Sequence, residues 1–427
     1  MMRGRINLCN SSAVPKKRGI RCQVCTGCGR CPGVEGVHIL TENRWKPEVN
    51  LHNDRQERLI TVDVGTTTIA MQLHRADGSV EDSFVAVNPQ TEYGADVISR
   101  ISAAQWQGAA EREGEQQKPD AAVKMQGQVL ETLEKGVSKF RKRILPQESL
   151  RMVLAANTTM VYLLMGWNTE ELGRAPFCAS HLEEVETEIA GVPCLILPGL
   201  SAFVGGDIVA GICATQMSTA TSPRLLIDLG TNGEMALGNR EKIYACATAA
   251  GPAFEGGVNR GVWGADMVKL LATLRREGML DETGLLTENY FETGIRIGNV
   301  CVTQEAVRAV QLAKAAIATG IEILLKDYGC TCEDVEQVIL AGGFGYYLNP
   351  MDAAEIGLLP GKLVHKTVSG GNTALAGALC IGEEWLKREP GYVKKIRNPE
   401  CNVKIINLAN QLEFENVYFA AMNLQSK

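Results

Sequence analysis

The residues with the clearest capacity for chemistry are four cysteines near the start of the 427-residue chain. Cys22, Cys25, Cys28 and Cys31 are separated by two residues each, and Pro32 follows the last of them. Two glycines lie within this run and a third follows it, and they let the backbone wrap closely around a small object. Four thiols in so short a segment indicate ligands of a metal centre rather than the disulfide framework of a secreted protein.

The spacing resembles the iron–sulfur ligand run of bacterial ferredoxins, C-x2-C-x2-C-x3-C-P, although the last gap is one residue shorter here. We therefore expect an iron–sulfur cluster, of the 4Fe-4S type, with Cys31 or a distant thiol such as Cys9 as the fourth ligand. Two alternatives stay open. Zinc sites normally place their CxxC pairs farther apart, and a lone CxxC is also typical of redox pairs.

The other cysteines mostly lie in apolar stretches, and we expect them to pack in the core. Cys330 and Cys332 are the strongest candidates for exceptions. The remaining residues of this group are Cys178, Cys194, Cys213, Cys246, Cys301, Cys380 and Cys401.

Overall composition is that of a folded protein, with 45% hydrophobic and 22% charged residues, and the length suits two or three domains. No apolar stretch is long enough for a membrane span or a secretory signal, so we expect a cytoplasmic protein without a membrane partner. The net charge of −6 argues against nucleic acid, although residues 1–32 hold seven basic side chains and no acid. This arm suits an acidic partner.

A strand, a polar turn and a second strand occur twice. Residues 59–64 form a β-branched run that ends in an acidic turn, and residues 69–73 continue it; residues 225–229 and 235–237 repeat the pattern. The repeat aligns Asp63 with Asp228 and Gly65 with Gly230. The turn residues are Gly65, Thr66, Thr67 and Thr68 in the first copy, and Gly230, Thr231, Asn232 and Gly233 in the second.

Such a pair of turns predicts phosphate and magnesium binding. Glycine lets consecutive backbone N–H groups approach an anion, and an Asp at a strand end can hold hydrated Mg2+. One hairpin of this composition is as often only a turn, but two copies with the same offset favour function. A third strand over residues 335–340 precedes Ala341-Gly342-Gly343-Phe344-Gly345, where a ligand could lie on bare backbone.

Together the three elements resemble the phosphate-1, phosphate-2 and adenosine motifs of the superfamily of acetate and sugar kinases, heat-shock chaperones and actin. The resemblance implies an α/β fold of two duplicated ribonuclease-H-like lobes, each with a mixed five-stranded sheet. It predicts connecting helices at residues 205–211 and 372–378, the second with small residues that allow close packing. We expect a Cys-rich iron–sulfur arm and linker over residues 1–50, the first actin-like lobe over 58–221 and the second over 222–427.

Within that superfamily the chain is similar to the reductive activators of corrinoid proteins over about residues 58 to 425. The stretches that carry this similarity are VDVGTTT, NPQTEYGADVISRI, LIDLGTNGE, ATAAGPAFEGG, QEAVRAVQLAKAAIATGIEIL, LAGGFG and LEFENVYFAAM. The best-known members begin with a larger plant-ferredoxin-like two-iron domain. This arm is too small for an independent core, so cluster ligation would have to organise it.

The similarity implies an ATP-hydrolysing reductase that passes one electron from an iron–sulfur cluster to Co(II) of a corrinoid protein, regenerating Co(I) for methyl transfer. Its cofactors would be the cluster, ATP and Mg2+, and the sequence leaves its electron donor and a homodimer open. By family position, Asp63 and Asp228 place Mg2+, and Asp207 positions the metal or the attacking water. The phosphates would lie on Gly65, Thr66, Thr67, Thr68, Gly230, Thr231, Asn232 and Gly233, and adenosine beside Gly342, Gly343, Phe344 and Gly345.

Rival functions need different features. A small-molecule kinase of the same fold would need no cluster, and a chaperone-like or sensory module would use ATP only as a switch for partner binding. The activator of 2-hydroxyacyl-CoA dehydratases is also an iron–sulfur ATPase, but its cluster cysteines lie within the ATPase domain. Residues 116–144 show the apolar spacing of an amphipathic surface helix, to which we assign no chemistry.

Overall fold

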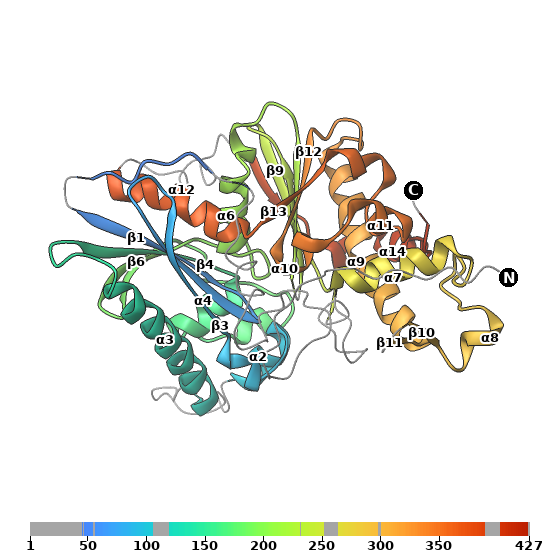
Figure 1. Ribbon diagram of the computed structural model, residues 1–427, viewed down its shortest axis with the longest axis horizontal. Helices are drawn as coiled ribbons and strands as arrows, with labels where there is room; N and C mark the ends of the chain where they lie inside the picture. The colour runs from blue at the N-terminus through green and yellow to red at the C-terminus, as the bar shows by residue number, and fades with distance from the viewer. Residues whose placement is uncertain are drawn as a thin grey trace.

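The computed structural model describes residues 45, 47–53, 56–105, 119–230, 232–251, 264–297, 300–388 and 402–425. The four clustered cysteines, Cys9, Cys401 and Thr231 lie outside these ranges. Two mixed sheets, each flanked by helices, form two lobes that stand side by side (Figure 1). This is the duplicated two-lobed α/β architecture that the sequence predicts.

The first sheet has the strand order β3-β2-β1-β4-β6-β5, and the second has the order β13-β12-β7-β8-β9-β14. The strands of the first sheet are β1 (Glu57–Val64), β2 (Thr68–His74), β3 (Val80–Val87), β4 (Ser149–Ala156), β5 (Val185–Ile189) and β6 (Val192–Ile196). Those of the second are β7 (Arg224–Leu229), β8 (Gly233–Gly238), β9 (Lys242–Thr248), β12 (Gln337–Ala341), β13 (Thr367–Gly371) and β14 (Asn402–Ile405).

The duplication is visible in the strand pairing. In each lobe three consecutive strands form an antiparallel meander, and two later strands extend the sheet in parallel beside the first strand of the meander. The expectation of five strands per sheet was wrong by one strand in each lobe. The additional edge strands are β5, which is antiparallel to β6, and β14, which is parallel to β9.

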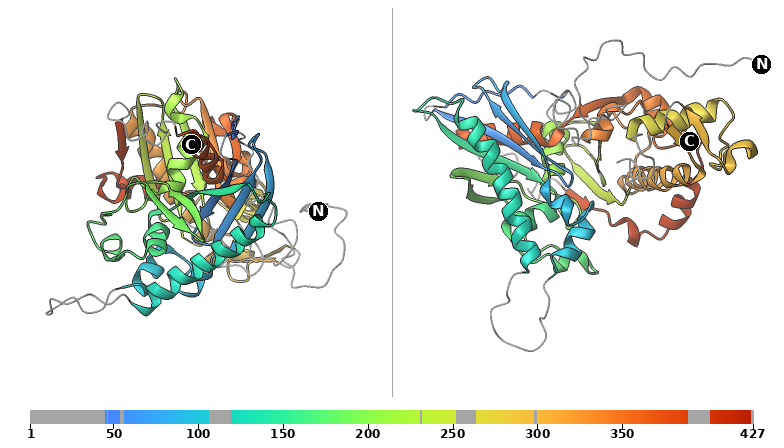
Figure 2. Two further views of the ribbon diagram at one scale, coloured as in Figure 1. Left: turned by 90° about the vertical axis from the view of Figure 1, so that its left-hand side faces the viewer. Right: turned by 60° about the horizontal axis from the view of Figure 1, so that its bottom comes forward.

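Helices of the first lobe follow from apolar periodicity. Along α3 (Asp120–Arg141) the residues Met125, Val129, Leu133, Val137 and Phe140 are buried at intervals of three or four, as expected for the amphipathic helix. Figure 2 shows α3 lying along the outside of the lobe. The other short elements here are η1 (Pro89–Glu92), α2 (Val97–Ala103), α4 (Thr158–Met165) and α5 (Glu170–Gly173).

The second lobe is organised around α9 (Gln304–Tyr328), which is buried along most of its length. Thr303 caps its N-terminus by accepting from the Ala306 amide, and Gly329 ends it in the left-handed conformation. The remaining short elements are η2 (Met217–Thr219), which packs on the helix that follows β6, and α7 (Gly264–Arg276), α8 (Glu288–Phe291), β10 (Ile295–Ile297), β11 (Val300–Val302), α10 (Gly342–Tyr347), α11 (Pro350–Glu355), η4 (Gly361–Lys366), η5 (Leu408–Asn410) and α14 (Phe414–Ala421) in the second half of the chain.

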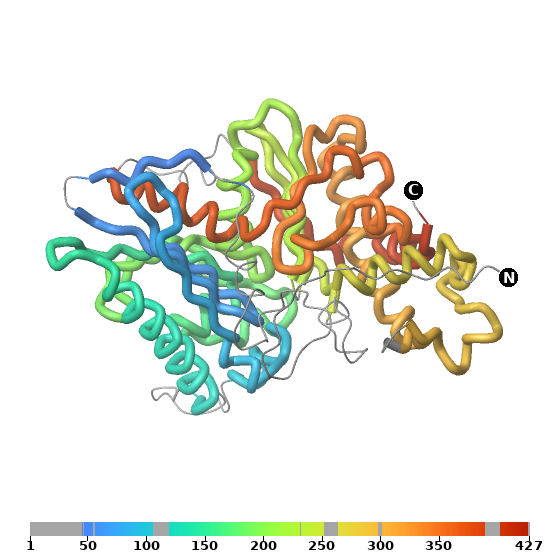
Figure 3. Tube along the Cα trace, viewed as in Figure 1, coloured from blue at the N-terminus to red at the C-terminus, as the bar shows by residue number. Residues whose placement is uncertain are grey.

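Two helices, α6 (Gly206–Ala214) and α12 (Thr373–Lys387), cross between the sheets. Although α12 comes late in the chain, it packs on β1 and β4 of the first sheet, and Figure 3 shows its orange trace beside the blue strands. Its apolar residues join a core cluster with Leu59 and Val153. A Cβ added at Gly377 would lie 1.8 Å from the Ala210 carbonyl oxygen, so the predicted close packing through small residues is confirmed.

The cysteines of the described ranges form no disulfide bonds. Cys194, Cys213 and Cys246 are buried as expected, and Cys301, Cys330, Cys332 and Cys380 are partly buried. Cys178 is exposed, contrary to the general expectation of core packing. Among the helices that the structure describes, none combines the length and the apolar character required to cross a bilayer.

Candidate functional site

Four acidic side chains from both sheets and from α6 gather between the lobes. Asp63 lies near the end of β1, Asp207 in the first turn of α6, and Asp228 and Glu234 on β7 and β8. Asp228 stands directly opposite Glu234 in the antiparallel pair and beside Ala341 in the parallel pair. The charge of Asp207 acts on each of the other three. The structure thus brings together all three predicted catalytic residues.

Burial dominates the electrostatics of this group. It raises the pKa of Asp63 to about 7 and that of Asp228 to about 8, and the neighbouring carboxylates add to both effects. Burial likewise raises the pKa of Asp207 to about 6, and it raises the pKa of Glu234 well above the usual value. Negative charge is therefore costly here, and a cation placed among these side chains would relieve that cost.

Asn372 ties this group to the helix that crosses the lobes. Its Nδ2 donates to Asp63 Oδ2 at 2.7 Å, which lowers the pKa of Asp63 against the effect of burial. Its Oδ1 accepts from the Leu375 amide at 2.8 Å and caps the N-terminus of α12. The same side chain therefore fixes both the start of α12 and one carboxylate of the site.

The two glycine turns occupy equivalent positions at the ends of β1 and β7. In the first, the Gly65 amide donates to the Thr68 carbonyl at 2.9 Å, and Thr66 is buried. In the second, the Gly230 amide donates to the Asn232 carbonyl at 3.0 Å. Gly233 begins β8. Both predicted hairpins are thus confirmed, and the role of their residues in phosphate binding stays a prediction.

The third predicted segment reaches the same place. Gly342 follows β12 with a φ of 79°, and a Cβ there would lie 2.5 Å from Asp228 Oδ1, so a larger residue would collide with the site. Gly342 to Tyr347 form the short helix α10, so the predicted place for a ligand lies at the start of this helix, and the binding itself stays a prediction. Gly343 and Phe344 are partly buried, Phe344 packs against the second-lobe core, and Gly345 is buried.

Sequence reasoning missed two residues of this site. Glu234 was part of the quoted stretch LIDLGTNGE, but only the strand register reveals that it faces Asp228. Asn372 precedes a run of small residues, a pattern typical of a helix cap, yet its contact with Asp63 depends on tertiary packing. Within the stretch ATAAGPAFEGG, which contributes to the family similarity, Thr248 ends β9 and residues 252–257 lie outside the described residues.

Direct metal ligation by protein alone is not evident at the site. Within the ranges that the structure describes, no three His, Cys, Asp or Glu side chains are close enough together to hold an ion by themselves. Carboxylate oxygens are the ligands that Mg2+ takes, usually one or two of them together with waters and substrate phosphates, and the Mg2+ role of Asp63 and Asp228 stays a prediction.

Comparison with known proteins gives a consistent result across both lobes. A family model described as the RACo middle region matches residues 59–220. A second, described as the C-terminal domain of RACo, the ASKHA domain, matches residues 222–260 and 257–427.

Named relatives agree with the family models. The chain is 30% identical over 415 residues to the corrinoid activation enzyme RamQ of Eubacterium limosum, covering 81% of this chain and 68% of that one. It is 24% identical over 244 residues to the [Co(II) methylated amine-specific corrinoid protein] reductase of Methanosarcina barkeri, covering 45% and 44% of the two chains.

A solved structure also matches. It is a reductive activator for corrinoid, iron-sulfur protein, with a TM-score of 0.72 and 27% identity, and the match covers 88% of this chain and 67% of that one. The two family models match in order along the chain, and a 30% identical relative and a solved structure agree with them. The chain therefore belongs to the RACo family of corrinoid activation proteins.

Proposed function

We propose that this protein uses ATP to reactivate a corrinoid protein, passing one electron to Co(II) and so regenerating the Co(I) form required for methyl transfer. The observation that carries the proposal is the gathering of Asp63, Asp207 and Asp228 beside two equivalent glycine turns. Relatives named as a corrinoid activation enzyme and a Co(II) corrinoid protein reductase support the choice of substrate.

ATP would bind between the lobes. The backbone amides of the turns Gly65 to Thr68 and Gly230 to Gly233 would receive its phosphates, because glycine permits close approach of the backbone to an anion. Its adenosine would lie beside the start of α10, at Gly342 to Gly345. Asp63 and Asp228 would hold hydrated Mg2+, and Asp207 would orient either that ion or the attacking water. Phosphates and Mg2+ together would neutralise the crowded carboxylates.

The electron would enter through the N-terminal arm. The donor set of Cys22, Cys25, Cys28 and Cys31 fits an iron–sulfur cluster, because clustered thiolates are its usual ligands. Such a cluster, when bound, supplies a donor that gives up one electron as Co(II) becomes Co(I), and a cellular reductant of unknown identity must then restore it. The basic charge of residues 1–32 suits an acidic docking partner.

Coupling between ATP and electron transfer would use the crossing helices. Because α6 carries Asp207 and α12 is capped by Asn372, which bonds Asp63, a change at the nucleotide site acts on both helices that join the lobes. A nucleotide that binds one arrangement of the lobes better than another shifts their population, and thereby changes affinity for the corrinoid protein.

The test begins with anaerobic reconstitution. Iron and sulfide are measured together with electron paramagnetic resonance of the reduced protein, with and without MgATP, in wild type and in Cys25→Ser. We expect a cluster signal that the substitution removes. Reduction of a Co(II) corrinoid protein is then followed by its visible absorption, and Co(I) should form only with MgATP and an intact arm. Zinc or no metal in the wild type would contradict the electron-transfer role.

A further inference from the structure

Three consecutive carbonyl groups of the first glycine turn, those of Gly65, Thr66 and Thr67, accept hydrogen bonds from two residues outside the turn. Asn88 Nδ2 donates to the Gly65 oxygen at 2.8 Å, and the Asn88 amide donates to the Thr67 oxygen at 2.9 Å. Between them, Arg100 Nη2 donates to the Thr66 oxygen at 2.5 Å. Three consecutive peptide oxygens are thus fixed by two residues that lie beyond β3.

Because the peptide group is planar and trans, fixing these carbonyl oxygens also fixes the direction of the N–H groups that follow them. In each peptide unit the C=O and the N–H of the next residue point in opposite directions. Because Asn88 and Arg100 hold the oxygens of Gly65, Thr66 and Thr67, the N–H groups of Thr66, Thr67 and Thr68 point away from these two residues. Successive amides that point to one side make a concave receptor for an anion.

Asn88 and Arg100, which hold the carbonyl groups of the turn, are themselves fixed by further hydrogen bonds. The Asn88 side chain accepts from the Gln90 amide at 3.0 Å and caps η1. Arg100 is fully buried, and its guanidinium also donates to the Gly94 oxygen at 3.0 Å and to Gln90 Oε1 at 3.4 Å. Gln90 is anchored in turn, because its Nε2 donates to the Met125 oxygen of α3.

Asn157 completes the arrangement from a third element. Its Nδ2 donates to Thr66 Oγ1 at 3.1 Å, while its Oδ1 accepts from the Met160 amide and caps α4. The second lobe has different residues at the matching places: Ala249 follows β9 where Asn88 follows β3, and Gly342 follows β12 where Asn157 follows β4. Among the described residues of the second lobe, the places of Asn88 and Asn157 are therefore taken by residues without a side-chain amide, so these two contacts are not a general consequence of the duplication.

We propose that Asn88, Arg100 and Asn157 are positioning residues that preset the first turn as a receptor for the polyphosphate of the nucleotide. The inference rests on the proposed binding of ATP at this turn. Arg100 adds more than shape, because a cationic donor makes a shorter and stronger hydrogen bond than a neutral one. Its bond polarises the peptide between Thr66 and Thr67, which strengthens the Thr67 N–H as a donor to phosphate.

The experiment separates binding of phosphates from binding of adenosine. Calorimetric titrations of the full chain use MgATP, MgADP and adenosine as probes, for wild type, Arg100→Met, Arg100→Lys and Asn88→Ser. The serine variant keeps an acceptor for the Gln90 amide but loses the donor to Gly65. Melting temperatures without nucleotide record whether each variant is folded, so the result does not depend on Arg100→Met alone.

We expect the loss of a charge-assisted hydrogen bond in Arg100→Met to weaken MgATP and MgADP binding by about tenfold or more. Adenosine affinity should stay within about twofold, since its proposed site lies in the other lobe. Arg100→Lys should recover part of the loss. A matched control is Arg141→Met, because Arg141 also donates to backbone oxygens, those of Ala190 and Gly191, but on another part of the first lobe.

Three results would overturn the inference in distinguishable ways. Folded Arg100→Met and Asn88→Ser that bind MgATP like the wild type would remove the positioning role and leave ATP binding intact. An equal loss of adenosine and MgATP affinity would show a general structural role instead. A wild type that binds no MgATP would overturn the proposed function together with this inference.

Discussion

Asn372 and Asp63 are joined by a hydrogen bond of 2.7 Å although 309 positions separate them in the chain. The bond connects the N-cap residue of α12, in the second half of the chain, with the end of strand β1, in the first half. It therefore links the two repeats. Because Asn372 also caps α12, a movement of that helix relative to β1 cannot occur without disturbing a carboxylate of the candidate site.

The first prediction concerns this bond. In Asn372→Ser the hydroxyl can still cap α12 but is too short to reach Asp63, so the hydrogen bond that lowers the pKa of Asp63 is lost. The pKa should rise above about 7, by about one unit for a bond to a charged group. A larger fraction of Asp63 is then protonated at neutral pH. MgATP binding is measured by calorimetry from pH 6 to 9. The variant should reach half its maximal affinity at a higher pH than the wild type.

Asn349→Ser is the matched control for that experiment. Asn349 caps α11 by accepting from the Met351 and Asp352 amides, so the substitution makes the same chemical change at a helix unconnected with Asp63. A pH profile that moves equally in both variants would show that helix capping, and not the bond to Asp63, is responsible.

The second prediction concerns acid stability and rests on His74. Its Nδ1–H donates to the Gly78 oxygen at 3.0 Å, and its Nε2 accepts from the Thr61 hydroxyl at 2.9 Å. Burial lowers the pKa of His74 from 6.5 to about 4. Above pH 6.5 the imidazole is neutral in both the folded and the unfolded state. As the pH falls below 6.5, the unfolded state takes up the proton first, so the free energy of unfolding decreases until about pH 4.

The shift corresponds to a loss of about 3 kcal/mol over that interval. His74→Gln has no proton to gain, so its free energy of unfolding should fall less between pH 6.5 and 4 than that of the wild type. Urea titrations at several pH values measure both proteins. Parallel pH profiles would contradict the assignment of a neutral buried imidazole.

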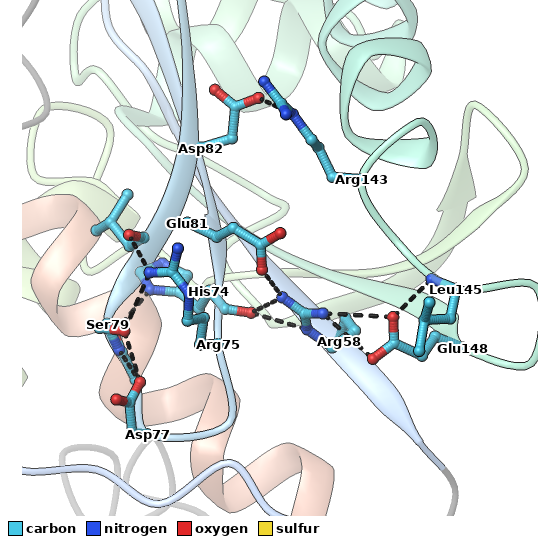
Figure 4. A network of polar contacts seen from close by, with 12 residues as sticks. Arg58, His74, Arg75, Asp77, Ser79, Glu81, Asp82, Arg143, Leu145 and Glu148 are labelled. Atoms are coloured by element: carbon cyan, nitrogen blue, oxygen red, sulfur yellow. Dashed lines mark hydrogen bonds and ion pairs between the residues drawn. The ribbon is translucent and has the colours of Figure 1, made fainter.

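The third prediction compares two arginines in the polar network of Figure 4. Arg58 donates to the His74 oxygen from both Nε and Nη2 and pairs with Glu81 and Glu148, and its side chain is 15% exposed. Arg143 pairs with Asp82 but is 59% exposed. Removing Arg58 takes the cationic donor from two carboxylates and a carbonyl, of which Glu148 keeps only the Leu145 amide as a donor. Water can replace the exposed Arg143 readily.

Arg58→Met should therefore lower the free energy of unfolding by about 2 to 4 kcal/mol, and Arg143→Met by less than about 1 kcal/mol. Chemical denaturation measures both variants, and 0.5 M salt provides a further check. Salt should weaken the Arg143 pair more than the sheltered Arg58 network. Equal costs for the two substitutions would contradict the role of burial in this comparison.

Local patterns were sufficient to predict much of this architecture. The two hairpins, the amphipathic α3 and the small-residue α12 each depend on residues that are neighbours along one strand or helix face, where periodicity and turn chemistry act directly. The edge strands β5 and β14 were not predicted, because an edge strand gains its pairing from a neighbour that periodicity does not reveal.

The candidate site was predictable only in part for a similar reason. Asp63 and Asp228 follow from a repeated motif at strand ends. Glu234 requires the register of β7 against β8, and the contact of Asn372 with Asp63 requires the packing of α12 on the first sheet. Such relationships arise between elements, where sequence spacing carries little information about distance.

The fourth prediction tests the contact between the crossing helices. A Cβ at Gly377 would lie 1.8 Å from the Ala210 oxygen and 2.3 Å from its carbon, which are backbone atoms that cannot turn aside. Gly377→Ala must therefore separate α12 from α6, and we expect it to lower the free energy of unfolding by about 3 kcal/mol or more.

Gly127→Ala is the matched control on α3, since nothing lies within 4 Å of its Cβ position. That substitution should stabilise the protein by up to about 1 kcal/mol through helix propensity. Melting curves compare the two alanine variants with the wild type, and a Gly377→Ala protein as stable as the wild type would contradict the tight crossing of α6 and α12.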